Sequence, residues 1–157
     1  MPDETQNPHD SVGWWAKRYY HANRAALEAA LRPYGLGSTQ WYVLYQLATD
    51  GPTMQRDLAQ WLRLERATLS GIVATLVRKG LIDQVADAVD QRQRVLRMTD
   101  AGMTLWVKIP DLVEVLRASS FQDASEADLA TTVSVLQAAT KRLNDFTSDG
   151  METPPVE

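Results

Sequence analysis

Residues 53–102 of this chain read TMQRDLAQWLRLERATLSGIVATLVRKGLIDQVADAVDQRQRVLRMTDAG. Apolar residues recur at helical spacing in two short stretches, 53–62 and 66–79, and a short turn separates them. Two strand-like runs follow at 81–85 and 93–98, joined by a polar loop. This order of helix, turn, helix and hairpin predicts a winged helix-turn-helix. The predicted fold class is therefore mainly α with a small β-hairpin wing (α+β).

The charge of this segment differs from that of the rest of the chain. The whole chain of 157 residues has a net charge of −4. Residues 53–99 contain eight basic and five acidic side chains and so carry +3, which leaves −7 on the remainder. A basic module within an acidic protein can bind DNA locally while the remainder repels it. The alternative is a solvated arginine-rich face without a function.

Composition argues against several other classes of protein. The chain is 45% hydrophobic and 23% charged, as expected of a soluble globular protein, and no apolar run approaches the ~18 residues of a membrane span. It has no cysteine, and His9 and His21 lie far apart in the sequence, so we expect neither a metal site nor a cofactor. Ser11 and Ser70 have no base arranged beside them, so we expect no enzyme. The polar, acidic N-terminus is unlike a signal peptide and suggests a cytoplasmic location.

The segments that flank the winged region carry their own apolar stripes. A helix is predicted over residues 12–31, capped by Ser11, and a second one begins at a cap on Ser38 or Thr39. Beyond the wing, a helix predicted from residue 99 to 119 contains Pro110, which should kink or interrupt it.

A last helix is predicted from a capping box at Ser125 and Asp128 to about Phe146. We therefore expect a winged domain over residues 37–100. The two flanking parts, 11–36 and 101–147, should form a helical dimerisation region. The ends, residues 1–10 and 148–157, are expected to be disordered tails.

The helix predicted over 66–79 has mostly small side chains on the face opposite its apolar stripe. The residues on and beside that face are Ala67, Gly71, Ala74 and Arg78, flanked by Ser70 and Thr75. A small face lets a helix backbone approach a large partner, and the first residues of a recognition helix meet base edges. Arg66, Thr68 and Ser70 are the candidates there, since arginine offers two donors to guanine and hydroxyls are less selective. The alternative is that the small face packs against another helix.

Basic residues also gather in the hairpin loop. A narrow minor groove attracts an inserted arginine, which makes Arg92 and Arg94 candidate DNA contacts. Asp90 could hold the loop or orient an arginine by a charge-assisted hydrogen bond. A surface ion pair of little energy is the alternative. At the start of the first helix of the motif, Thr53, as its cap, and Gln55 are candidates for phosphate contact.

Three motifs follow one another in this segment: a recognition helix that ends in Leu76, Gly80 and Leu81, a wing with Asp90 and Arg92, and Met98, Thr99 and Gly102 at the opening of the next helix. Together they resemble the MarR family of bacterial transcription regulators. Met98 replaces the usual leucine. Gln84 stands where many members have arginine, which leaves that arginine's phosphate contact open. The order of predicted elements matches over about residues 12–147, nearly the whole chain.

The resemblance implies an obligate homodimer in which the first and last helices of both subunits interlock. The apolar stripes of the flanking helices agree with this, because a small winged domain offers them no partner. A two-fold dimer predicts a palindromic operator in double-stranded DNA, with half-sites about one turn, ~10 bp, apart.

Aromatic residues near the N-terminus suggest a sensor site. Trp15, Arg18 and Tyr19 share one helical face, and Trp41 and Tyr45 share a face of the second predicted helix. Aromatic walls with one guanidinium suit a small, planar, anionic ligand. The resemblance implies phenolic ligands in the same region, between the dimer helices and the winged domain. The alternative is a dimer core rich in tryptophan and tyrosine, with Arg18 in a salt bridge.

The sequence thus predicts a homodimeric, sequence-specific DNA-binding regulator. We expect a repressor that a small aromatic anion releases from its operator. A winged-helix protein-interaction module without DNA binding and a ligand carrier are the alternatives. The basic wing favours DNA binding, since neither alternative needs Arg92 and Arg94.

Overall fold

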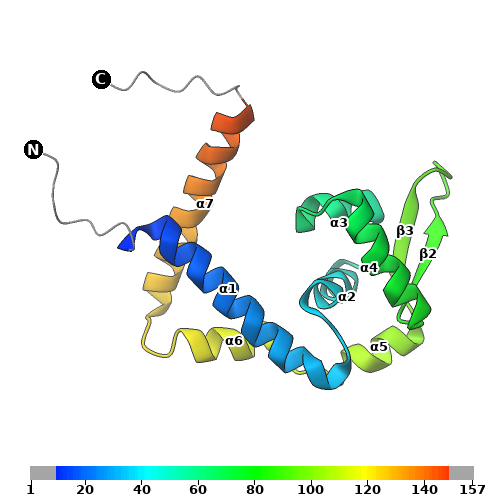
Figure 1. Cartoon of the computed structure of the whole chain (residues 1–157), viewed down its shortest axis with the longest axis horizontal. Coiled ribbons are helices and arrows are strands. Elements are labelled where there is room, and N and C mark those ends of the chain that lie inside the picture. The colour runs from blue at the N-terminus through cyan, green and yellow to red at the C-terminus, as the bar shows by residue number, and fades with distance from the viewer. Residues whose placement is uncertain (1–9, 149–157) are drawn as a thin grey trace, which may run out of the picture. The chain divides into compact units, whose positions relative to one another are not determined.

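Residues 10–148 are described by a computed structural model of this chain (Figure 1). In chain order the elements are α1 (Val12–Leu31), η2 (Arg32–Tyr34), α2 (Ser38–Asp50), β1 (Thr53–Met54), α3 (Gln55–Leu62), α4 (Arg66–Arg78), β2 (Ile82–Ala86), β3 (Arg94–Met98), α5 (Asp100–Trp106), α6 (Leu112–Ser120) and α7 (Glu126–Ser148). The described part of the chain divides into two compact units, with the boundary between Leu116 and Arg117 in the sequence. The tails predicted at 1–10 and 148–157 lie, except for Asp10 and Ser148, outside the described residues.

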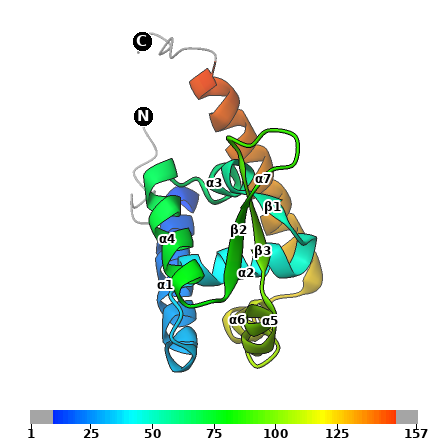
Figure 2. The same ribbon diagram turned by 90° about the vertical axis from the view of Figure 1, so that its right-hand side faces the viewer.

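The first unit is a winged helix-turn-helix, as predicted. β2 and β3 form an antiparallel hairpin, with Ile82 opposite Met98 and Val85 opposite Val95. Figure 2 shows this hairpin rising beside α3 and α4. Both strands were predicted within one residue of their ends.

A third strand, β1, was not predicted. Thr53 and Met54 pair with β3 on the side away from β2, so the sheet order is β1-β3-β2. The prediction that Thr53 caps the following helix was therefore wrong. Met54 takes the N-cap position of α3 instead, and the Thr53 hydroxyl donates to the Gly51 carbonyl at 2.9 Å.

One apolar core holds the helices of this unit to the sheet. Its fully buried large side chains include Leu31 of α1, Leu44 of α2, Leu58 of α3, Leu76 of α4 and Leu96 of β3. Burying each such side chain contributes about 1.5–3 kcal/mol to folding. The core thereby fixes α4 by one face and leaves its other face to solvent.

The end of α4 is closed by a Schellman motif. Gly80 adopts a left-handed backbone conformation, with φ at +70°, which costs a glycine little free energy. The Leu81 amide donates to the Leu76 carbonyl at 3.0 Å, and the Gly80 amide donates to Val77 at 2.9 Å. The sequence prediction of Gly80 as the residue that ends this helix is confirmed.

The start of α2 differs from the prediction of a Ser38 or Thr39 cap. Gly37 is the N-cap, and Ser38 is the first helical residue. The Glu28 carboxylate of α1 accepts hydrogen bonds from both the hydroxyl and the amide of Ser38, the latter at 3.0 Å. These bonds, the hydroxyl bond first, hold the pKa of Glu28 below its ordinary value. Through these hydrogen bonds Glu28, ten residues before Ser38, links α1 to the start of α2.

Pro110 interrupts the helix predicted from residue 99 to 119. α5 ends at Trp106, α6 begins at Leu112, and the connection buries Ile109. The missing amide hydrogen and the ring of proline prevent a continuous helix. Of the two outcomes expected for Pro110, interruption is the one observed.

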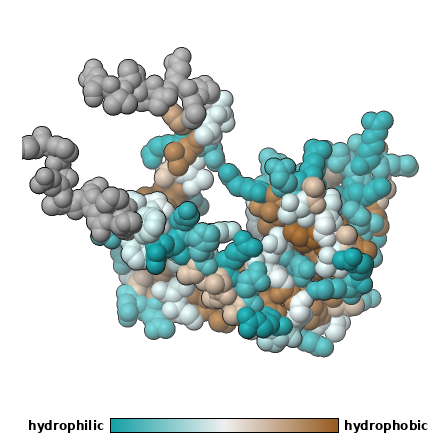
Figure 3. Space-filling model, viewed as in Figure 1, coloured by the Kyte–Doolittle hydropathy of each residue, from teal (hydrophilic) through white to brown (hydrophobic). Residues whose placement is uncertain are grey.

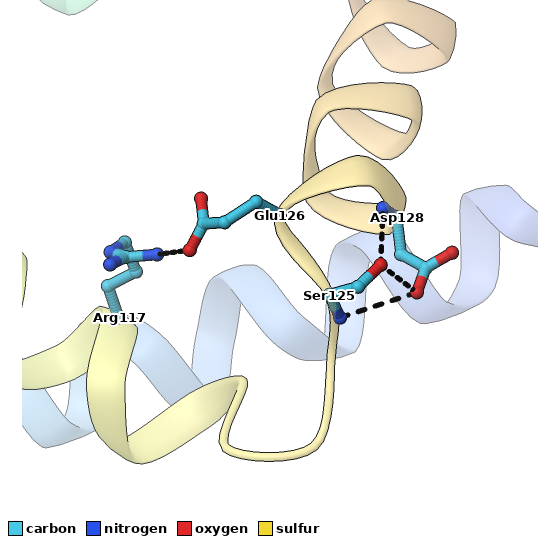
Figure 4. A network of polar contacts seen from close by, with 4 residues as sticks. All are labelled: Arg117, Ser125, Glu126 and Asp128. Carbon is cyan, nitrogen blue, oxygen red and sulfur yellow. Dashed lines mark hydrogen bonds and ion pairs between the residues drawn. The ribbon is translucent and has the colours of Figure 1, made fainter.

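The second unit, from Arg117 onward, is built on α7. The predicted capping box is present: the Ser125 hydroxyl accepts from the Asp128 amide at 3.1 Å and donates to the Asp128 carboxylate at 2.6 Å (Figure 4). Arg117 and Glu126 form an ion pair at 3.0 Å beside it. None of the described residues of α7 is buried within the single chain. Among residues 10–148, no helix is both long enough and apolar enough to cross a membrane.

Candidate nucleic-acid interface

The outward face of α4 is open. Leu69, Val73 and Leu76 are buried on the opposite side. The predicted contact residues Arg66, Ala67, Thr68, Ser70, Gly71, Ala74 and Arg78 are exposed, and Thr75 is half-buried. A Cβ built on Gly71 would meet no atom within 4 Å. Within the described chain this small face is therefore not packed against another helix.

Two predicted contacts near the C-terminal end of α4 are engaged with each other. The Thr75 hydroxyl donates to the Gly71 carbonyl at 3.1 Å and accepts from Nη2 of Arg78 at 3.0 Å. The hydroxyl of Thr75 is thus satisfied inside the helix. Arg78 is the outer member of this pair and presents its charge at the far end of the face.

The wing loop is held by two aspartates. The Asp87 carboxylate accepts from the amides of Asp90 and Val89 at 2.9 and 3.1 Å. These bonds, Asp90 first, lower the pKa of Asp87. The Asp90 carboxylate accepts from the backbone amide of Arg92 at 3.0 Å. Of the two roles expected for Asp90, holding the loop is therefore the one observed.

A groove runs between α3, α4 and the wing. Four arginines line it: Arg56, Arg66, Arg92 and Arg94. Arg94 also donates to the Gln91 carbonyl at 3.1 Å, which braces the wing at the groove's rim. In Figure 3 the upper end of this unit, where the wing lies, is covered mostly by hydrophilic residues. The groove concentrates positive charge that phosphate oxygens can neutralise.

The structure brings five of the twelve predicted DNA contacts to this groove; the others lie outside its lining, on α4 (Ala67, Thr68, Gly71, Thr75 and Arg78), in the wing loop (Asp90) and in β1 (Thr53). Gln55, Ser70 and the predicted arginines 66, 92 and 94 all line the groove. Thr53, predicted as a phosphate contact, instead sits half-buried in β1 with its hydroxyl bonded to Gly51. Its place in the sheet is the reason that the expected cap geometry is missing.

Sequence reasoning missed Arg56 and Gln84. Arg56 lines the groove beside Gln55, and its positive charge next to a predicted phosphate contact is the signal that could have identified it. Gln84 was singled out only for not being an arginine, yet its Nε2 donates to Oε1 of Gln55 at 2.6 Å.

Comparison with known proteins assigns the family. A model described as the MarR family matches residues 34–93, from the end of η2 through the wing loop. Over this segment the chain matches the MarR family. The resemblance found in the sequence motifs is thereby confirmed. Members of the family are transcription regulators rather than enzymes, in agreement with the expectation for this chain.

Similar proteins support this family and its fold. The HTH-type transcriptional regulator YwoH of Bacillus subtilis (strain 168) is 35% identical over 69 residues, 44% of this chain and 50% of that relative. The chain therefore spans about half the length of this relative. Bordetella bronchiseptica BpsR, whose DNA binding is regulated by 6-hydroxynicotinic acid, has a TM-score of 0.75 at 21% identity, covering 86% of this chain and 96% of its own. S. aureus MepR, solved as a DNA complex, has a TM-score of 0.76 at 20% identity, covering 87% and 99%. At these identities the two structures show the winged-helix fold of the family.

The predicted sensor residues separate into two clusters. The outer cluster lies at the start of α1. The Arg18 guanidinium stands 5.7 Å from the ring centroids of Trp14 and of Trp15, an arrangement that permits cation–π attraction. Trp15 is 54% and Tyr19 43% exposed. Arg18 thus lies over the aromatic rings of its own helix.

The inner cluster lies in the core of the first unit. The rings of Trp41 and Tyr45 are 5.2 Å apart, and Trp106 of α5, which was not predicted, lies 6.0 Å from Trp41. Trp41 is only 4% exposed. Its Nε1 hydrogen has no acceptor within residues 10–148. A buried donor without a hydrogen-bond partner reduces the stability of a fold by about 1–3 kcal/mol, so an acceptor bound at this atom would be stabilising.

Proposed function

We propose that this chain is a sequence-specific, DNA-binding transcriptional regulator. The observation that carries the proposal is the groove in which arginines from α3, α4 and the wing meet: Arg56, Arg66, Arg92 and Arg94. The open small face of α4 lies beside it. Together they offer a helix surface for close approach and a cationic surface for phosphates.

The division of labour follows from position. Arg66 begins α4, and the first residues of a recognition helix reach base edges, so Arg66 would read guanine through its two donors. Arg92 lies in the wing loop and would enter the minor groove beside it, where its charge would also neutralise a flanking phosphate. Arg56 and Arg94 would contact phosphates, which position the protein without reading sequence.

The uncovered apolar residues of the flanking helices support a homodimer. On α7, Val133, Leu136, Leu143 and Phe146 are 37–64% exposed in the single chain, and Figure 3 shows apolar residues along this helix. A single soluble chain rarely leaves such a stripe in water. A two-fold dimer would recognise a palindromic operator with half-sites ~10 bp apart, and its occupancy of a promoter would repress transcription.

Selection from random double-stranded DNA by the purified protein tests the proposal. We expect enrichment of a palindrome, with tighter binding than to random DNA and a steep dependence on salt. The alternative is a winged-helix protein-interaction module, which would enrich no sequence. The arginine groove favours the DNA-binding function, because a module that does not bind DNA has no need of it.

A ligand response is supported by the inner aromatic cluster. The unpaired Nε1 of Trp41, beside Tyr45 and Trp106, could donate to a carboxylate of a planar aromatic acid. The regulation of the similar BpsR by 6-hydroxynicotinic acid makes such an acid the natural first probe. We expect 6-hydroxynicotinic acid or a related aromatic acid to quench tryptophan fluorescence and weaken operator binding. A panel of such acids without thermal shift and without loss of DNA binding would exclude this response.

A further inference from the structure

The side chains of Gln84, Gln55 and Ser70 form a hydrogen-bonded relay across the groove. Gln84 of β2 donates from Nε2 to Oε1 of Gln55 on α3 at 2.6 Å. Gln55 in turn donates from Nε2 to Oγ of Ser70 on α4 at 3.3 Å. All three side chains line the groove. The side-chain amide of Gln55 thus links the wing, α3 and the recognition helix α4.

The hydrogen bonds of this relay have a direction, which decides whether the Ser70 hydroxyl donates or accepts. The oxygen of Gln55 accepts from Gln84, so its amide nitrogen is the group left for Ser70. The Ser70 oxygen therefore accepts, and its hydrogen has no acceptor among residues 10–148. Ser70 is exposed on the outward face of α4, so this hydrogen is available to a partner outside the chain.

Resting on the proposed function, we infer that Gln84 and Gln55 are positioning residues that present Ser70 to the major groove as a hydrogen-bond donor. An unconstrained serine pairs with donors and acceptors on base edges alike. An oriented one selects an acceptor: N7 or O6 of guanine, N7 of adenine, or O4 of thymine. It disfavours cytosine, whose major-groove edge offers the N4 amino donor. The relay gives a hydroxyl the selectivity that it otherwise lacks.

Reversing the relay separates this role from a structural one. In Gln84→Glu the new carboxylate only accepts, so Gln55 must turn its amide to donate to it. The Gln55 oxygen then faces Ser70 and accepts its hydrogen. Ser70 would present lone pairs to the DNA and pair with a donor such as N4 of cytosine. The hydrogen-bonded link persists, while the base preference changes.

The experiment is DNA selection with the full chain, comparing wild type, Ser70→Ala, Gln84→Glu and the control Gln93→Glu. Gln93 lines the same groove outside the relay, so this control adds the same charge. At one operator position we expect wild type to disfavour cytosine by about threefold to tenfold. Ser70→Ala should lose that preference at that position alone, and Gln84→Glu should shift it toward cytosine. Gln93→Glu should weaken binding to all sequences alike and keep the wild-type preference.

Each other outcome has a definite meaning. Equal base preferences for Ser70→Ala and wild type, or for Gln84→Glu and Gln93→Glu, would overturn the inference and leave the proposed function standing. A wild-type protein that enriches no sequence would overturn both. Gln84→Met, which removes the donor without adding charge, provides a second variant, and its preference should flatten at the same position. All substituted side chains are on the surface of the groove, and unchanged thermal unfolding verifies the fold of each variant.

Discussion

Gly102 lies directly against the carbonyl oxygen of Leu81. A Cβ at position 102 would stand 2.1 Å from that oxygen and 2.8 Å from Cγ of Met98. The Thr99 amide donates to the same carbonyl at 3.1 Å, and the Thr99 hydroxyl accepts a hydrogen bond from the Gly102 amide at 3.0 Å. The Thr-x-x-Gly motif that opens α5 is thus a close contact between α5 and the segment that joins α4 to the wing.

Gly102→Ala should therefore destabilise the fold. The neighbouring atom is backbone and cannot move aside cheaply, so we expect the free energy of unfolding to fall by about 1–3 kcal/mol. Chemical denaturation followed by circular dichroism measures it. The control is Ala101→Ser at the exposed neighbouring position, which should change the same quantity by less than about 0.5 kcal/mol. Equal stability of the two variants would show that the contact is not rigid.

Gly71→Ala should have the opposite effect on stability. Gly71 lies inside α4 with open space where a Cβ would go, so alanine should stabilise the helix by about 0.5–1 kcal/mol. If the α4 backbone approaches DNA closely at this point, the added methyl group should weaken operator binding. Thermal unfolding and a DNA titration on the same preparation measure the two effects. Improved stability with unchanged affinity would place the DNA away from Gly71.

Local patterns in the sequence were sufficient for the features that neighbouring residues determine. Ser11 caps α1 by accepting from the Trp14 amide at 3.2 Å, and Gly80 ends α4, both as predicted. The capping box at Ser125 and Asp128 is of the same kind. In each case the donor and acceptor lie within a few residues of each other, so spacing alone identifies them.

Features that depend on distant partners were missed for the same physical reason. β1 is only two residues long and exists through pairing with β3, some forty positions later. The Glu28 cap of α2 comes from another helix. The relay from Gln84 through Gln55 to Ser70 joins three elements, and the spacing of these residues in the sequence does not predict it. Three of the groove's four arginines (Arg66, Arg92 and Arg94) were predicted from the sequence, whereas the hydrogen-bonded geometry of the site required the fold.

Arg92→Ala should reduce the salt dependence of DNA binding. If Arg92 neutralises one phosphate charge, its loss lowers the slope of log K against log salt by about 0.9 and weakens binding to all sequences. Arg97→Ala is a matched control, since Arg97 is exposed on β3 but does not line the groove. Titrations at several salt concentrations compare them. An unchanged slope for Arg92→Ala would remove Arg92 from the phosphate contacts.

The wing should loosen in acid because of Asp87. Its amide hydrogen bonds favour the charged carboxylate and lower its pKa. A lowered pKa means that the stabilisation is complete above the ordinary carboxyl pKa and is lost as the pH falls through the folded value. We expect amide exchange at Val89 and Asp90 to stay slow down to that range and then to accelerate. Asp87→Ala should show fast exchange already at neutral pH, and a variant with unchanged protection would contradict this role.

Leu143→Glu should separate the proposed dimer. Leu143 is 64% exposed on the apolar side of α7 in the single chain, so a buried charge there is costly only if a second copy covers it. Sedimentation analysis should show a monomer, and binding to the full palindrome should fall toward that of one half-site. Ser134→Glu adds the same charge on the opposite side of α7, where serine is exposed, and should leave a dimer. If both variants sediment like the wild type, the apolar side of α7 does not hold the subunits together.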